Sequence, residues 1–291
     1  MQANYTSKGR SKAVRGERVL DENRIKEILA AANEPVKLVF YDSTDSTNNR
    51  AKEWAKNGCA GECVAFLARE QTAGRGRRGR SFLSQRGGIY TSLLFYPDDS
   101  IEIQKITAEA AAAAALAIED CTGLSVDIKW VNDLYVNEKK LAGILTEGEF
   151  DENGKLSYCV LGLGINVYKI EDFSEKMPIA TTLEDEICRA KDTSENKKTE
   201  LDINEIFVSV LSALIKFFDK KKPSDKKESA LLLAEYRKRC FVIGKNVLFR
   251  RGNDEFFATV KGVNSDYSLS VLLPSGEEIS LNSGEVSTVI K

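Results

Sequence analysis

The 291-residue sequence contains no histidine. This absence excludes Ser-His-Asp triads, Cys-His dyads and the HExxH zinc site, each of which needs an imidazole as a base or a ligand. Any chemistry that the protein performs must therefore rely on lysine, arginine, carboxylate, hydroxyl and amide groups.

Cysteines are few and follow no paired pattern. The six cysteines lie at positions 59, 63, 121, 159, 188 and 240. No second pair follows Cys59 and Cys63 at zinc-finger spacing, so no protein-held metal is predicted. The sequence also shows no signal peptide and no apolar stretch of about 20 residues, so no membrane contact is expected. Together these absences predict free thiols and a cytoplasmic location.

Basic residues are not in excess, because 42 Lys and Arg face 44 Asp and Glu for a formal net charge of -2. A general binder of nucleic acid usually carries a basic surplus across a whole domain. DNA is therefore not expected as a partner, and any basic site must be local.

We predict three segments along the chain. Residues 1–20 are polar and basic without periodicity, which indicates a flexible leader. Residues 21–240 are predicted to form one large domain. From residue 241, short apolar runs are broken by Gly, Asn and Pro-Ser-Gly turns, which predicts a small β-barrel over residues 241–291.

The large domain is predicted to be α/β (α+β) with an antiparallel or mixed sheet, because helical and strand periodicities alternate along it. Expected helices span residues 21–32, 103–121 and 203–218, with another running to Gly58 and one ending at about 239. Expected strands span residues 36–42, 63–70, 88–97, 126–130, 140–150 and 156–167.

The segment AGRGRRGR at residues 73–80 holds four arginines and three glycines between two predicted strands. A dinucleotide-binding turn would open a helix, and a nucleotide-hydrolase phosphate loop would end in Gly-Lys-Ser/Thr. A disordered RGG segment would normally repeat. Glycines let the backbone approach a ligand, and arginines offer paired donors to phosphate oxygens. Two interpretations of the segment therefore remain. It is either a loop that encloses a small anion or a solvated loop without a specific role.

Two further segments carry polar residues in compact patterns. In KWVNDLYVNEKKLAGILTE, Lys129 and Lys140 flank an Asn132-Asp133 turn between predicted strands, so cations, an amide and a carboxylate can face one pocket. A hairpin with solvated lysines is the competing interpretation. The segment DSTNN at residues 45–49 also gathers polar side chains that could face a pocket. Its competing interpretation is a helix N-cap.

Taken together, these segments resemble the biotin protein ligase family. The resemblance rests on Ser46-Thr47-Asn48, Gln71 followed by AGRGRRGR, KWVNDL, Lys140 in KKLAGILTE and the later GLGIN at residues 162–166. It covers residues from about 36 to 291. It implies a catalytic domain related to class II aminoacyl-tRNA synthetases, followed by a small SH3-like β-barrel. No helix-turn-helix pattern precedes the match, so a short form without the DNA-binding domain of some members is expected.

The resemblance also implies an activity. Such ligases activate biotin with ATP as biotinyl-5'-AMP and transfer it to one lysine of a carboxylase's biotin carboxyl carrier domain. ATP implies Mg²⁺, although no ligand cluster for a metal is recognised. The expected partners are biotin, ATP and the carrier domain, and a homodimer is left open.

Site residues follow from the matched motifs. The implied catalytic residues are Lys140, Arg77 and Asp133. The implied biotin-binding residues are Ser46, Thr47, Asn48, Gln71, Arg75, Gly76, Arg77 and Lys140. The implied ATP-binding residues are Arg77, Arg78, Arg80, Lys129 and Asn132. Lys140 would bridge the biotin carboxylate and the α-phosphate, whereas Asp133 is either a base in the transfer step or a turn residue.

The sequence departs from the family pattern at two places. Phe82 and Ser84-Gln85 stand where a tryptophan and a Ser-Pro pair are common, and Val131 stands where proline is usual. Two rival functions are a lipoate or octanoate ligase on a related fold and a nucleic-acid-binding protein that uses the arginine-rich loop. The first would need a longer and entirely apolar pocket. The second would bind in a strongly salt-dependent way that ignores ATP and biotin.

Overall fold

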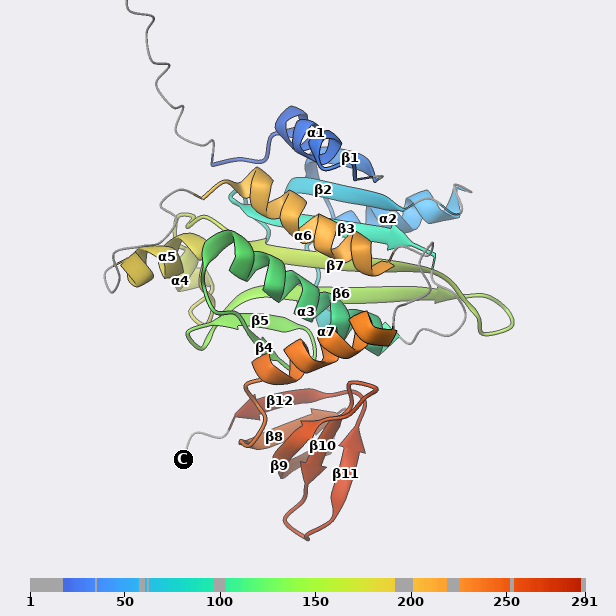
Figure 1. Cartoon of the computed structure of the whole chain (residues 1–291), viewed down its shortest axis with the longest axis vertical. Helices are drawn as coiled ribbons and strands as arrows, with labels where there is room; N and C mark the ends of the chain where they lie inside the picture. The colour runs from blue at the N-terminus through green and yellow to red at the C-terminus, as the bar shows by residue number, and fades with distance from the viewer. Residues whose placement is uncertain are drawn as a thin grey trace, which may run out of the picture.

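The computed structural model describes residues 18–34, 36–57, 61, 63–96, 103–191, 201–218, 226–251 and 254–288. Most of the predicted leader, residues 1–17, lies outside this part of the chain, as does Cys59. The described residues form a large α/β unit and a smaller β-sheet below it (Figure 1).

A seven-stranded mixed sheet forms the centre of the large unit, in the order β1-β2-β3-β7-β6-β5-β4. The strands are β1 (Lys37–Thr44), β2 (Val64–Gln71), β3 (Gly88–Phe95), β4 (Asp127–Lys129), β5 (Asp133–Val136), β6 (Lys139–Phe150) and β7 (Leu156–Asn166). Only β1 and β2 pair in parallel, and the other neighbours are antiparallel. The prediction of a mixed α/β fold is confirmed.

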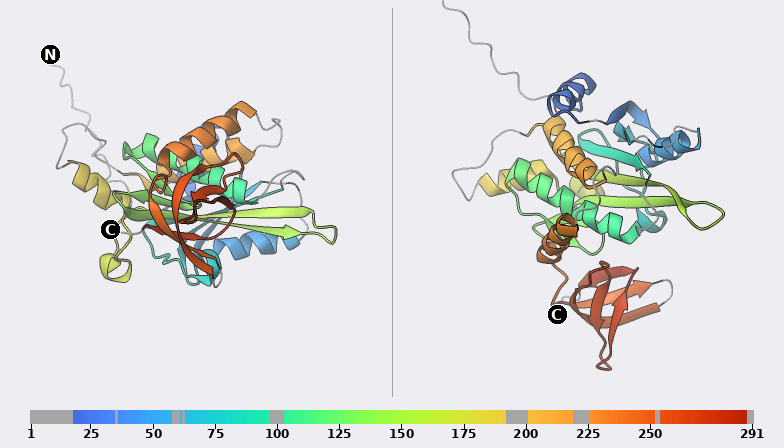
Figure 2. Two further views of the ribbon diagram at one scale, coloured as in Figure 1. Left: turned by 90° about the horizontal axis from the view of Figure 1, so that it is seen from below. Right: turned by 45° about the vertical axis from the view of Figure 1, so that its right-hand side comes forward.

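Helices cover both faces of this sheet (Figures 1 and 2). The helices α3 (Ile103–Thr122), α6 (Ile203–Phe218) and α7 (Lys226–Arg239) lie on one face, with α1 (Glu22–Ala31) packed against α6. The helix α2 (Thr47–Lys56) lies on the opposite face. Strand β2 is accordingly apolar at successive positions, because Val64 and Phe66 pack beneath α2 while Ala65 and Leu67 join the main core.

The alanine run of α3 explains how this helix reaches the core. Ala110 through Ala115 are all at most 6% exposed, so both sides of the helix are buried. Alanine favours the helix and its methyl group lets neighbouring backbones approach closely. This α3 segment therefore packs against α6, α7 and the sheet at once.

Two short helices after β7 are not among the expected elements. They are α4 (Phe173–Lys176) and α5 (Leu183–Lys191). Lys140 is tied to the segment between them, because its backbone N–H donates to Ile179 O at 2.9 Å. Strand β5 was also not expected, since Asp133 was assigned to a turn and instead begins this strand.

The C-terminal unit is a five-stranded antiparallel sheet in the order β11-β10-β9-β8-β12. Its strands are β8 (Asn246–Arg251), β9 (Asp254–Val263), β10 (Leu269–Leu272), β11 (Glu278–Leu281) and β12 (Glu285–Thr288). Within the described residues β11 and β12 do not pair, so the structure contains a β-rich unit but no closed barrel. Trp130 attaches the two units, because its indole N–H donates to Tyr267 O at 2.9 Å.

Candidate active site

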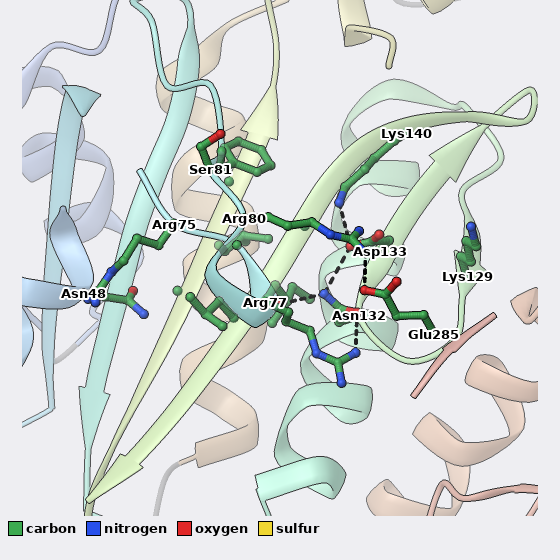
Figure 3. Close-up of a pocket in the computed structure, with 18 of the residues that line it drawn as sticks. Asn48, Arg75, Arg77, Arg80, Ser81, Lys129, Asn132, Asp133, Lys140 and Glu285 are labelled. Atoms are coloured by element: carbon green, nitrogen blue, oxygen red, sulfur yellow. Dashed lines mark hydrogen bonds and ion pairs between the residues drawn. The ribbon is translucent and has the colours of Figure 1, made fainter. Parts of the chain in front are cut away.

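A cavity of about 310 Å³ opens between the mixed sheet and the C-terminal sheet (Figure 3). Its walls come from the start of α2, the arginine-rich loop, strands β5, β6 and β7, and residues 284–287 beside and within β12. The volume is at the lower end of the range for small-molecule sites. Most predicted site residues line it: Ser46, Thr47, Asn48, Gln71, Arg75, Gly76, Arg77, Arg80, Lys129, Asn132, Asp133 and Lys140.

Neutral polar groups gather where α2 begins. Ser46, Thr47 and Asn48 are all less than 5% exposed, although each carries a polar side chain. The N–H and hydroxyl of Thr47 both donate to Gln71 Oε1, at 2.8 and 3.1 Å. Gln71 in turn donates through Nε2 to Ser84 Oγ at 2.9 Å. These hydrogen bonds hold the α2 start against the end of β2 and fix the direction of the Gln71 amide.

Asn48 lies in a space that a glycine leaves open. Its Oδ1 accepts from Ser92 Oγ at 2.6 Å, and its Nδ2 donates to Glu147 Oε2 at 2.7 Å. A Cβ on Gly162 would lie 2.3 Å from Asn48 Oδ1. Gly162 in the GLGIN segment thus makes room for a buried amide at the cavity wall.

The arginine-rich loop folds back on itself beside this wall. The N–H of Gly76 donates to Arg80 O at 2.7 Å, and the N–H of Phe82 donates to Gly74 O at 2.9 Å. Residues Arg77–Gly79 form one 3₁₀ turn, in which Arg78 has a φ of 57° and Gly79 a φ of 72°. Two consecutive left-handed residues reverse the chain, which explains a glycine at position 79.

Each arginine of the loop has an acceptor or anion nearby. Arg77 donates to Asn132 Oδ1 at 2.9 Å, and Arg75 donates to Asn49 Oδ1. Arg80 forms an ion pair with Glu285 of β12, and Arg78 lies 3.8 Å from the same carboxylate. Burial, together with the neighbouring Arg78 charge, lowers the pKa of Arg77. The Arg77 guanidinium is therefore a partly desolvated cation at the cavity.

A second set of charges faces the loop from β4, β5 and β6. Lys140 Nζ lies 2.8 Å from Asp133 Oδ1, and Asn132 donates from Nδ2 to Asp133 Oδ1 at 3.1 Å (Figure 3). Burial lowers the pKa of Lys129, and the opposing effect of the Asp133 charge is smaller. One end of the cavity thus combines cations with an amide and the carboxylates of Asp133 and Glu285.

The structure adds site residues that the motifs did not mark. Glu285 and Arg250 reach the cavity from the C-terminal sheet, and nothing in their local sequence distinguishes them from surface charges. Arg78 is the one predicted site residue that does not line the cavity. Phe82 lies against Gly164, where a Cβ would be 2.6 Å from its ring, so an aromatic wall is present at that position.

The arrangement suits an anion next to a neutral polar ligand. Carbonyl and N–H groups of a ligand can bind at the α2 start, and negative charge can be compensated by Arg77, Lys129 and Lys140. Among the described residues, no group of three or more Cys, Asp or Glu could hold a metal by itself. No helix in the described part of the chain is long and apolar enough to cross a membrane.

Known proteins resemble this chain over segments that line the cavity. The biotin/lipoate A/B protein ligase family matches residues 40–166, which contain the α2 start, the arginine-rich loop and KWVNDL. The bifunctional ligase/repressor BirA of Bacillus subtilis is 41% identical over 152 residues. That match covers 50% of this chain and 46% of BirA, so the chain spans about half the length of this relative.

Two further relatives align along most of the chain. The biotin–[acetyl-CoA-carboxylase] ligase of Paracoccus denitrificans is 29% identical, over 81% of this chain and 94% of its own length. The biotin protein ligase from Aquifex aeolicus, solved in complex with biotin and ATP, has a TM-score of 0.70 and 26% identity. The structural match covers 86% of this chain and 97% of the Aquifex aeolicus chain. The motif resemblance is thereby confirmed: residues 40–166 match the biotin/lipoate A/B protein ligase family, and the structural neighbours of the chain include biotin protein ligases.

Proposed function

We propose that this protein is an ATP-dependent biotin protein ligase. It activates biotin as biotinyl-5'-AMP and then transfers the biotinyl group to one lysine of a biotin carboxyl carrier domain. The observation that carries the proposal is one cavity with a neutral polar end around Asn48 and a cationic end around Lys140. Biotin has the matching halves, because its ureido ring is neutral and its carboxylate must meet a phosphate.

The neutral end is proposed to bind the ureido ring. Ser46, Thr47, Asn48 and Gln71 offer hydroxyl and amide groups that both donate and accept, as a ureido carbonyl and its two N–H groups require. The backbone of residues 75–77, including Gly76, would close the edge of this subsite. Phe82 would provide an apolar wall beside Gly164.

The cationic end is proposed to bind the carboxylate and the α-phosphate. Two anions about 4 Å apart repel strongly unless positive charge lies close to both. Lys140 would bridge them, Arg77 and Arg80 would hold phosphate oxygens, and Lys129, Asn132 and Arg78 would act on the nucleotide side. The biotin carboxylate oxygen attacks the α-phosphorus, the bond to pyrophosphate breaks, and the mixed anhydride forms.

In the transfer step, the acceptor amine attacks the acyl carbon of the mixed anhydride. A C–N bond forms, the C–O bond to phosphate breaks, and AMP leaves. We propose that Asp133 takes the proton lost by the amine, since its carboxylate lines the cavity 2.8 Å from Lys140.

Magnesium would enter with ATP. Mg²⁺ is usually held by one or two carboxylates plus substrate phosphates, and Asp133 and Glu285 are the carboxylates that line the cavity. The ion would neutralise charge on the departing pyrophosphate.

The proposal assigns the domains as residues 21–240 for catalysis and 241–291 for a small unit of SH3-like type, after a leader at 1–20. The class II synthetase relationship, a cytoplasmic location and the absence of a DNA partner belong to it as well.

A mass-spectrometric assay tests the proposed function. The protein is incubated with ATP, Mg²⁺, biotin and a carboxylase carrier domain, and one carrier lysine is expected to gain the mass of a biotinyl group. A carrier with that lysine changed to arginine is the control. Modification by lipoate or octanoate in place of biotin would contradict the proposal and favour the related ligases.

A further inference from the structure

Glu147 in β6 is a half-buried carboxylate beside the Asn48 end of the proposed biotin site. Its Oε2 accepts from Asn48 Nδ2 at 2.7 Å, and its Oε1 accepts from Lys52 Nζ at 2.6 Å. Arg75 NH2 of the arginine-rich loop lies 3.6 Å from Oε2. One side chain thus contacts α2 at two positions and the loop at a third.

The Glu147 carboxylate is ionised in the folded protein. Burial is the largest single effect and opposes the charge, but the hydrogen bonds from Lys52 and Asn48, together with the charges of Lys52 and Arg75, lower the pKa of Glu147. An ionised carboxylate only accepts hydrogen bonds, so it fixes which end of the Asn48 amide faces it. Turning that amide over would place Oδ1 against the carboxylate and would turn the NH₂ group toward Ser92, whose hydroxyl now donates to Oδ1.

The same carboxylate acts on the loop. Arg75 also donates to Asn49 Oδ1. The Arg75 guanidinium is therefore in contact with both an α2 residue and Glu147. Because Asn48, Asn49 and Lys52 all belong to α2, Glu147 links the helix that begins the neutral subsite to the loop that borders it.

We propose that Glu147 is a positioning residue of the biotin site, which orients the Asn48 amide and anchors Arg75 so that helix and loop hold biotin together. This inference rests on the proposed function. Glu147 does not line the cavity itself and acts through Asn48 and Arg75. It therefore affects biotin affinity more than ATP affinity, since its contacts are with Asn48, Lys52 and Arg75 at the neutral end.

Biotin affinity is measured by titration calorimetry in the full-length protein without ATP. Glu147→Ala is expected to weaken biotin binding about tenfold or more, because Asn48 loses the acceptor that fixes its orientation. Glu147→Gln retains an acceptor for Asn48 but loses the charge that holds Arg75. It is expected to keep most of the biotin affinity, while trypsin cleaves the arginine-rich loop faster than in the wild type. The matched control is Glu149→Ala, which removes an exposed carboxylate two residues further along β6, and it should bind biotin like the wild type.

The KM for ATP is measured with the same variants and is expected to change much less than the biotin affinity. Wild-type biotin affinity in Glu147→Ala would overturn the inference, as would equal losses for biotin and ATP. If Glu147→Ala does not fold, unchanged loop cleavage in Glu147→Gln would overturn it. Absence of biotin binding by the wild-type protein would overturn the proposed function as well, so the two failures are distinguishable.

Discussion

Lys140 shows how a single side chain is prepared for charge compensation. Its backbone pairs with the segment at Ile179, and its ammonium lies against Asp133, so both ends of the residue are held. Asp133 is 23% exposed at its side chain, so water can solvate it when Lys140 turns toward a ligand. Loss of the ammonium should therefore affect the reaction more than the fold.

We predict that Lys140→Ala abolishes adenylate formation in a protein that remains folded. A contact made chiefly in the transition state contributes about 3 kcal/mol, or roughly two orders of magnitude in rate. The measurement is biotin-dependent exchange of pyrophosphate into ATP, with Lys139→Ala as the neighbouring control. Exchange near the wild-type rate in Lys140→Ala would remove this residue from the catalytic role.

Strand β7 carries glycines that have a specific structural reason. Glycine weakens a strand unless another group occupies the place of its side chain. At Gly162 that group is the Asn48 amide, and at Gly164 it is the Phe82 ring. Side chains from α2 and from the loop that follows the arginines thus pack against β7 at these two glycines.

We predict that Gly162→Ala weakens biotin binding. The new methyl carbon would lie 2.3 Å from Asn48 Oδ1, which is too close, so the Asn48 side chain would be displaced. Calorimetric titration with biotin checks the expected loss, which is about tenfold for one misplaced hydrogen-bonding group. Gly262→Ala in β9 is the matched control, because no atom lies within 4 Å of its added Cβ. Equal affinities in the two variants would contradict the role of Gly162.

Elements with strong periodicity were predictable, whereas several of the shorter ones were not. Helix α3 and strands β2, β3 and β7 lie where the apolar patterns place them, because each buries most of its apolar residues. The four-residue helix α4 and the four-residue β5 carry too few residues to show a period. The site follows the same rule: Lys140 and Arg77 stand in compact motifs, but Glu285 reaches the cavity only through the packing of a distant sheet.

At the scale of the whole molecule, a buried carboxylate lies where the two units meet. Glu109 of α3 is 1% exposed and accepts hydrogen bonds from Ser229 of α7 at 2.7 Å and from Tyr267 of the C-terminal unit at 3.3 Å. Lys105, 3.9 Å away, is the cation that faces it. Burial raises the pKa of Glu109, with smaller opposing effects from Ser229, Lys105 and Tyr267.

We predict that Glu109→Gln is more thermally stable than the wild type at pH 7. A carboxyl group whose pKa is raised by folding stabilises the fold below its unfolded pKa, and this contribution is lost as pH rises through the folded value. Glutamine keeps hydrogen-bonding capacity without the charge. The difference in Tm should be greatest at neutral pH and vanish on acidification toward the ordinary glutamate pKa of 4.5. A constant difference across this range would contradict the argument.

The last prediction concerns the arginine-rich loop, where residues of both units line the cavity. Four like charges within residues 73–80 repel one another, and three glycines increase the entropy lost on ordering. Arg80 forms an ion pair with Glu285 of the C-terminal sheet, and Arg78 lies 3.8 Å from the same carboxylate. A phosphate offers the same guanidinium groups a stronger acceptor and thereby orders the loop over the adenylate.

Trypsin tests this directly, because it cleaves after arginine. We expect the free protein to be cut between Arg75 and Arg80, and biotin with ATP and Mg²⁺ to slow this cut far more than either ligand alone. Glu285→Gln should be cut faster than the wild type without ligands, since the charge that restrains Arg80 is gone, whereas the exposed Glu277→Gln should not. Ligands should still protect the Glu285 variant, because the phosphate and not Glu285 orders the closed loop. Equal cleavage rates with no ligand, with biotin, with ATP and Mg²⁺, and with all of them would show that the loop does not enclose the adenylate, and would return its arginines to the interpretation as nucleic-acid contacts.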